Sequence, residues 1–81
     1  MPYRVNSAGV RKLDQIEQGG TPYETLTDLQ LRALLYLTED RPGDTEEYTE
    51  SSEIAKALGV HPQAARGVMW SLYKRGLVDK E

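Results

Sequence analysis

Cysteine is absent from this 81-residue sequence, histidine occurs once, and long apolar runs are missing. Without cysteine the chain can form neither a disulfide framework nor a thiolate metal site, which fits a reducing compartment. No apolar run, including that at residues 34–37, is long enough to span a bilayer or to serve as a signal peptide. We therefore expect a soluble, cytoplasmic protein without membrane contact.

Catalytic and metal-binding side chains are also scarce. The only histidine, His61, precedes a proline at a predicted helix start, whereas catalysis usually requires a histidine, cysteine or carboxylate pair in a cleft. Acidic residues cluster from Asp40 onward, but Pro42 and Thr45 occupy the third and sixth places, which excludes an EF-hand calcium loop. We expect one small domain, residues 1–81, with a solvated acidic loop, no metal site, no cofactor and no enzymatic activity.

Charge is distributed unevenly along the chain. Residues 1–54 carry five basic and eleven acidic side chains, whereas residues 55–81 carry five basic and two acidic ones. The net charge of -3 therefore hides a positively charged C-terminal part. Such asymmetry is typical of a surface that faces nucleic acid.

Two helices are predicted before residue 50. In the segment 1–20, Met1 to Val5 has only a weak extended signal, and a helix from about Ala8 to Gln18 follows, capped by Asn6 or Ser7. Its narrow apolar stripe either covers the core of its own chain or serves as a dimerisation arm. The expected stripe consists of Val10, Leu13 and Ile16.

The segment 21–50 holds the first core helix and the acidic loop. Two capping boxes precede this helix, one at Thr21–Glu24 and one at Thr27–Gln30, and we place the helix from about Asp28 to Glu39. Because it is apolar over more than one face, we expect it to lie between the N-terminal helix and the C-terminal part.

The segment 51–78 has the pattern of a helix-turn-helix. A short helix capped by Ser51 or Ser52 ends at Gly59, for which we predict the left-handed conformation, and Val60 packs into the core. A second helix follows, with His61 as its cap and Pro62 as its first residue. Its predicted buried face consists of Ala65, Val68, Met69 and Leu72, and Leu77 and Val78 fold back onto the same core.

These residues resemble a known family. Glu53–Ala55, Leu58–Val60, His61–Pro62 and Leu72–Val78 are similar to the helix-turn-helix core of winged-helix transcriptional regulators of the MarR kind. The resemblance implies a mainly α fold: a three-helix, winged-helix-like core with an extra N-terminal helix and at most very short strands. It also implies a transcriptional regulator that binds double-stranded DNA with residues 62–75 as its recognition helix.

The resemblance assigns roles to individual residues. The start and outer face of the recognition helix would read bases in the major groove, since arginine can pair with guanine and glutamine with adenine. These residues are His61, Gln63, Ala64, Arg66 and Gly67. The residues that would contact the DNA backbone are Lys56, Lys74 and Arg75.

Two features depart from the family pattern. The sequence ends at Glu81, after the expected first strand of the wing, so we expect no second wing strand and a homodimer that doubles the DNA contacts. Trp70 falls on the predicted outer face, where it either packs under the N-terminal helix or is exposed as an anchor for a protein; stacking on nucleic acid is the least favoured reading. The alternative function is a non-catalytic protein-protein interaction module that uses Trp70 and Tyr73.

Overall fold

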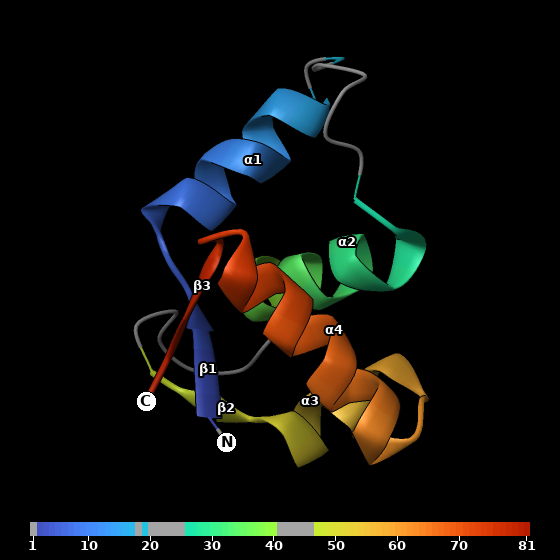
Figure 1. Cartoon of the computed structure of the whole chain (residues 1–81). Helices are drawn as coiled ribbons and strands as arrows, with labels where there is room; N and C mark the ends of the chain where they lie inside the picture. The colour runs from blue at the N-terminus through green and yellow to red at the C-terminus, as the bar shows by residue number, and fades with distance from the viewer. Residues whose placement is uncertain (1, 18, 20–25, 41–46) are drawn as a thin grey trace.

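The computed structural model describes residues 2–17, 19, 26–40 and 47–81. These residues form a mainly helical structure, as predicted, and their short strands pair in a three-stranded antiparallel sheet that was not predicted (Figure 1). None of the helices that they form is both long and apolar enough to cross a membrane. In chain order the elements are β1 (Pro2–Val5), α1 (Ser7–Glu17), α2 (Asp28–Leu35), the π-helical turn η2 (Tyr36–Asp40), β2 (Thr49–Glu50), α3 (Ser51–Leu58), α4 (Pro62–Lys74) and β3 (Val78–Lys80).

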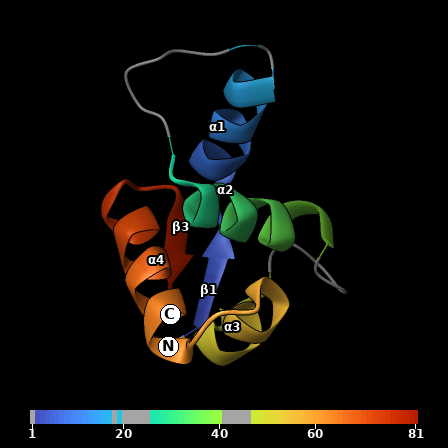
Figure 2. The same ribbon diagram turned by 90° about the vertical axis from the view of Figure 1, so that its right-hand side faces the viewer.

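Helix α2 lies at the centre of the helical packing, which confirms that it is covered on more than one side. It contacts α1 on one side and both α3 and α4 on the other (Figure 2). Ala33 and Leu34 on α2 are completely buried, and one apolar cluster contains residues from β1, α1, α2, η2, α3, α4 and β3. A single core of this kind is what a chain of this length can form.

The two ends of α2 differ in structure: a capping box begins the helix, and a π-helical turn follows its end. At its start Thr27 and Gln30 form the predicted capping box: the Thr27 hydroxyl accepts from the Gln30 N–H at 3.2 Å, and the Gln30 side chain accepts from the Thr27 N–H at 3.0 Å. At its end the α-helix stops at Leu35 and continues as the π-helical turn η2, so the prediction of one helix to Glu39 missed this change. The capping box at residues 21–24 and the acidic loop at 41–46 lie outside the described residues.

Strand β1 is the middle strand of the sheet, so the weak extended signal predicted for Met1 to Val5 corresponds to a strand, and the sheet around it was not predicted. The strand order is β2-β1-β3, and Tyr3 lies opposite both Thr49 and Lys80 in antiparallel register. Tyr3 and Val5 point into the core, because alternate strand residues face opposite sides of a sheet. Four residues are too few to show a clear alternation of apolar and polar side chains. The two strands that pair with β1 are also distant from it in sequence, so no local pattern predicts the sheet.

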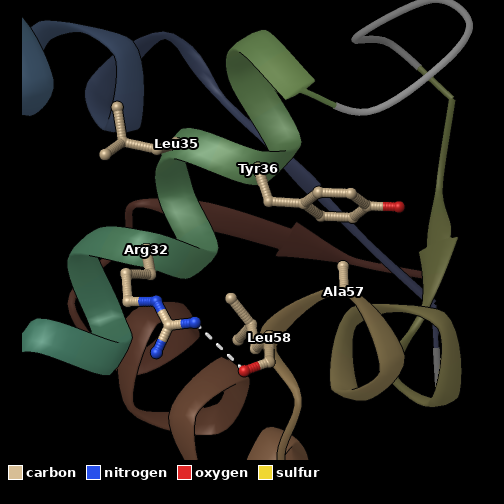
Figure 3. Close-up of a pocket in the computed structure, with 5 residues that line it drawn as sticks. All are labelled: Arg32, Leu35, Tyr36, Ala57 and Leu58. Atoms are coloured by element: carbon tan, nitrogen blue, oxygen red, sulfur yellow. Dashed lines mark hydrogen bonds between the residues drawn. The ribbon is translucent and has the colours of Figure 1, made fainter.

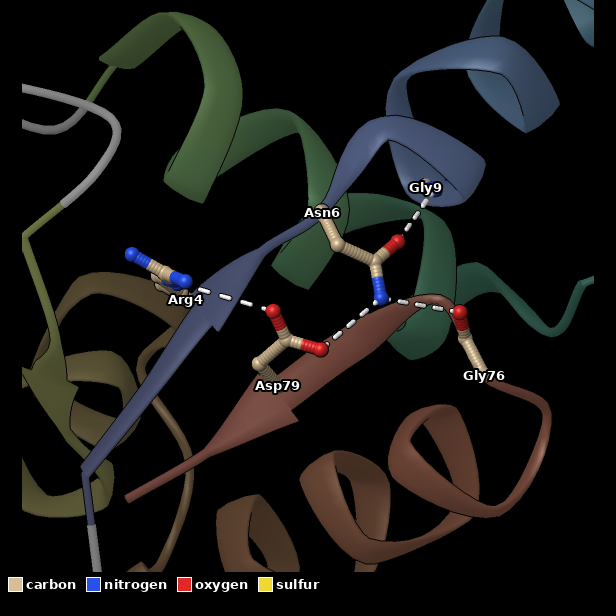
Figure 4. A network of polar contacts seen from close by, with 5 residues as sticks. All are labelled: Arg4, Asn6, Gly9, Gly76 and Asp79. Atoms are coloured by element: carbon tan, nitrogen blue, oxygen red, sulfur yellow. Dashed lines mark hydrogen bonds and ion pairs between the residues drawn. The ribbon is translucent and has the colours of Figure 1, made fainter.

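A polar junction around Asn6 holds the start of α1 against the end of α4 (Figure 4). The Asn6 side-chain oxygen accepts from the N–H of Gly9 at 3.0 Å, which confirms the predicted cap. Its amide group donates to the Gly76 carbonyl at 2.9 Å and to Asp79 Oδ1 at 3.2 Å. Asp79 Oδ2 in turn lies 3.5 Å from Arg4 Nε, so the Asn6 and Asp79 side chains together link β1, α1 and β3.

Helix α1 packs on its own chain, which matches the covering role predicted for it. Leu13 is 4% exposed and belongs to the core cluster, and Gly9 and Lys12 are also buried. Val10 is 39% exposed, so the predicted stripe of Val10, Leu13 and Ile16 was wrong at its first position. The buried face is shifted toward Gly9 because the backbone of α1 comes very close to the Leu77 carbonyl, just before β3, and to the Val5 side chain of β1, where only a glycine leaves enough room.

Candidate nucleic-acid interface

Helix α3 and the turn after it form the first half of the predicted helix-turn-helix. Gly59 has a φ of 69° and ends α3 in the left-handed conformation, as predicted. The next residue, Val60, donates its N–H to the Ala55 carbonyl at 3.0 Å and packs against the core. The predicted serine cap was wrong: Glu50 is the N-cap residue, its side chain does not cap the first turn, and Ser51 is buried in that turn.

The turn is also connected to α2. Arg32 Nη2 donates to the Leu58 carbonyl at 3.1 Å, which satisfies a carbonyl at the end of α3 (Figure 3). The same contact borders an open pocket of about 200 Å³ between α2 and α3, lined by Arg32, Leu35, Tyr36, Ala57 and Leu58. Arg32 therefore has a structural role in positioning α3 relative to α2.

Helix α4 follows the predicted pattern closely. His61 Nδ1 accepts from the N–H of Gln63 at 3.1 Å, so His61 caps the helix, and Pro62 is its first residue. Three of the predicted core residues, Ala65, Met69 and Leu72, are completely buried, and Val68 is partly buried against the same cluster. The inner face of α4 is thus fixed by packing, which determines which side chains point outward.

The predicted base-reading residues all lie on the exposed surface at the start of α4. These residues are His61, Gln63, Ala64, Arg66 and Gly67. The guanidinium group of Arg66 forms no hydrogen bond or ion pair within the described part of the chain. A methyl group added at Gly67 would meet no atom within 4 Å, so the surface beside Arg66 is open.

The predicted backbone-contacting residues are exposed as well, but they come from two helices. Lys56 lies on α3, whereas Lys74 is the last residue of α4 and Arg75 is its C-cap. Positive side chains therefore occur near both ends of α4. At the C-terminal end they also stabilise the helix dipole.

An exposed cluster of aromatic and basic side chains covers the C-terminal half of α4. Its members, called the Trp70 cluster below, are Trp70, Tyr73, Lys74 and Lys80. The Trp70 and Tyr73 ring centroids are 5.5 Å apart, and the side chains are 45% and 38% exposed. Trp70 is therefore exposed, as one of the predicted alternatives requires, and does not pack under α1.

Lys80 is the member of the Trp70 cluster that sequence reasoning missed. Its ammonium nitrogen lies 5.2 Å from the Trp70 centroid and 5.1 Å from the Tyr73 centroid, within the range of cation–π attraction. A period-two pattern after Gly76 would have placed Lys80 on the same side of β3 as the buried Val78. Its contact with α4, however, depends on how β3 folds back along that helix.

Tyr3 supports the Trp70 cluster from β1. It lies opposite Lys80 in the sheet register and is only 3% exposed. Burial, and to a smaller extent the proximity of Tyr73, raises the pKa of Tyr3 above its ordinary value of 10.0. Tyr3 is therefore neutral at physiological pH and adds no negative charge beneath the lysines.

Comparisons of the chain with models of known families, with curated proteins and with solved structures find no match. Among the residues that the structure describes, no three histidine, aspartate or glutamate side chains come together as a metal site. Function is therefore inferred from the surface of α4 itself.

Proposed function

We propose that the protein is a transcriptional regulator that binds double-stranded DNA, with α4 as the recognition helix. The observation that carries this proposal is the exposed start of α4, where Arg66 has no partner in the described part of the chain and its neighbours Ala64 and Gly67 are small. Small neighbours allow a close approach to base edges, and a free guanidinium can form two hydrogen bonds with guanine. Gln63, one turn earlier on the same helix, can pair with adenine.

The arrangement around α4 supports a winged-helix-like fold. Helices α2, α3 and α4 pack together, and a sheet stands beside them with β3 directly after α4. We expected no second wing strand, and in the structure β1 pairs with β3 along Tyr3, Arg4 and Val5. We propose that β1 takes the position of that wing strand.

A homodimer would double the DNA contacts of one copy. The outward side of α1 carries Val10, which is 39% exposed, and a self-complementary contact there would give a two-fold dimer. Sedimentation velocity of the wild type and of Val10→Glu tests this proposal. A wild type that stays monomeric at all concentrations would exclude the α1 dimer.

Fluorescence anisotropy with mixed-sequence duplex DNA tests the main proposal. Binding should be measurable at about 20 mM salt and should weaken steeply as salt rises, because lysine and arginine displace counterions from phosphates. Arg66→Ala should weaken it further. Arg66→Lys, the matched variant, keeps the charge but loses the planar pair of donors, so it should reduce sequence preference more than total affinity.

The protein-interaction alternative is tested by the same titration. Trp70 and Tyr73 have the exposure that a protein partner would need. If no duplex binds even at about 20 mM salt, DNA recognition by α4 is excluded and the alternative is favoured.

A further inference from the structure

The Trp70 cluster presents two aromatic rings to solvent on one side of α4. Trp70 and Tyr73 are one helical turn apart, and their ring planes are inclined by 33°. Neither ring belongs to the apolar core cluster. Large exposed rings contribute little to folding, so this pair is available to contact a partner.

Two lysines surround these rings. Lys80 lies between 5 and 6 Å from both centroids, and the Lys74 ammonium nitrogen lies 5.9 Å from the Trp70 centroid. The residue before Lys80, Asp79, faces the opposite side of β3, where it pairs with Arg4 and Asn6. The ring side of this surface therefore carries positive charge, while the nearby carboxylate is neutralised on the other side.

Flat exposed rings beside ammonium groups fit the chemistry of a nucleotide. An acidic peptide would pair with the lysines through its carboxylates, whereas a nucleotide supplies in one unit both a flat aromatic base for stacking and a phosphate for the lysines. Inside a duplex the base faces are covered by neighbouring pairs, and a helix in the groove reaches only base edges. Unpaired bases leave their faces free for stacking.

We propose that the Trp70 cluster binds single-stranded nucleic acid. An unpaired base stacks on Trp70 and Tyr73, and Lys74 and Lys80 contact the adjacent phosphates. This activity goes beyond duplex recognition and does not require it, because Arg66 and the residues beside it take no part in the stacking. The cluster lies one to two turns beyond Arg66 on the same face of α4, so a strand that leaves a bound duplex could reach it.

Tryptophan fluorescence reports on this site directly, because Trp70 is the only tryptophan in the chain. An oligothymidylate titrated into the full chain should quench the emission and saturate together with the anisotropy of a labelled oligonucleotide. Trp70→Ala should weaken binding of the labelled strand roughly 5- to 150-fold, the equivalent of one lost stacking contact. Lys80→Ala should reduce the slope of log affinity against log salt by about 0.7.

Two control variants separate this proposal from duplex binding. Arg66→Ala should weaken duplex binding by a larger factor than single-strand binding, because Arg66 lies one turn from Trp70 and contributes only its charge, and no stacking surface, to the cluster. Arg11→Ala removes a positive charge from α1, at the end of the molecule opposite the C-terminus, and should leave single-strand binding unchanged (Figure 1). Chemical denaturation of each variant confirms that it folds.

Three results would overturn the proposal: no single-strand binding at about 20 mM salt, single-strand binding that Trp70→Ala does not weaken, or quenching by polyglutamate but not by the oligonucleotide. The last result would assign the cluster to an acidic protein partner. If the wild type binds single strands but does not bind duplex DNA, this result would contradict only the function proposed for Arg66.

Discussion

Among single residues, Gly9 shows most clearly how the absence of a side chain allows close packing. A Cβ at this position would overlap the Leu77 carbonyl oxygen and lie 2.6 Å from Val5 Cγ2. We expect Gly9→Ala to lower the free energy of unfolding by about 1–3 kcal/mol, because backbone and core atoms would have to move. Urea denaturation followed by circular dichroism measures the change.

Gly67→Ala is the matched control for this experiment. It adds the same methyl group to a helix, but into open space, and should raise the free energy of unfolding by about 0.5–1 kcal/mol. Equal stability changes in the two variants would show that the close approach at Gly9 has no energetic consequence.

Tyr3 provides a prediction about pH. Its folded-state pKa is raised above 10.0 by burial and by Tyr73, so above pH 10 the unfolded chain releases this proton before the folded chain does. The stability that Tyr3 contributes is therefore complete below pH 10 and declines as the pH rises above it. Free energies of unfolding between pH 8 and 11 should fall less steeply for Tyr3→Phe than for the wild type; parallel curves would contradict this assignment.

At the scale of elements, the junction of β1, α1 and β3 depends on Asn6. Asn6→Ala removes the cap of α1 and two hydrogen bonds to distant residues, and should lower the free energy of unfolding by about 1–2 kcal/mol. Ser7→Ala, at the exposed neighbouring position, should change it by less than about 0.5 kcal/mol. Thermal or urea denaturation compares the two.

Asn6→Asp separates the capping of α1 from the hydrogen bonds that the Asn6 side chain donates to Gly76 and Asp79. Aspartate keeps the acceptor for the Gly9 N–H, but it loses the donor to Gly76 and places a second carboxylate beside Asp79. We expect Asn6→Asp to remain destabilised. Wild-type stability in this variant would mean that only the cap of α1 matters.

At the scale of the whole molecule, residues 2–5 and 78–80 are joined in one sheet beside α4. Strand β1 lies between β2 and β3, and Glu81 donates its N–H to the Pro2 carbonyl at 3.2 Å. The C-terminal half of α4 thereby receives Lys80 as a neighbour. The exposed surface of α4 then has two parts, the part around Arg66 for which we propose contacts with base edges and the Trp70 cluster for which we propose stacking with unpaired bases.

The sequence by itself determined where the helices lie and the caps of α1, α2 and α4, because these depend on neighbours within four residues, although it missed the cap of α3 and the change to η2 after Leu35. The Thr27 capping box, the left-handed Gly59, the His61 cap and the inner face of α4 all follow from local periodicity and side-chain chemistry. It also determined which residues α4 exposes. An outward face is the complement of a buried one that repeats every three to four residues.

Only the tertiary structure decided what depends on contacts between distant residues. The pairing of β1 with β3, the shift of the buried face of α1 to Gly9, and the placement of Lys80 over Trp70 join residues about 70 or about 10 positions apart. No local pattern encodes such contacts, because strand pairing is set by packing of the whole core. Whether α1 covers Trp70 also belongs here, since the sequence placed Trp70 on the outer face of α4 but left both alternatives open, and only the packed structure shows the side chain 45% exposed.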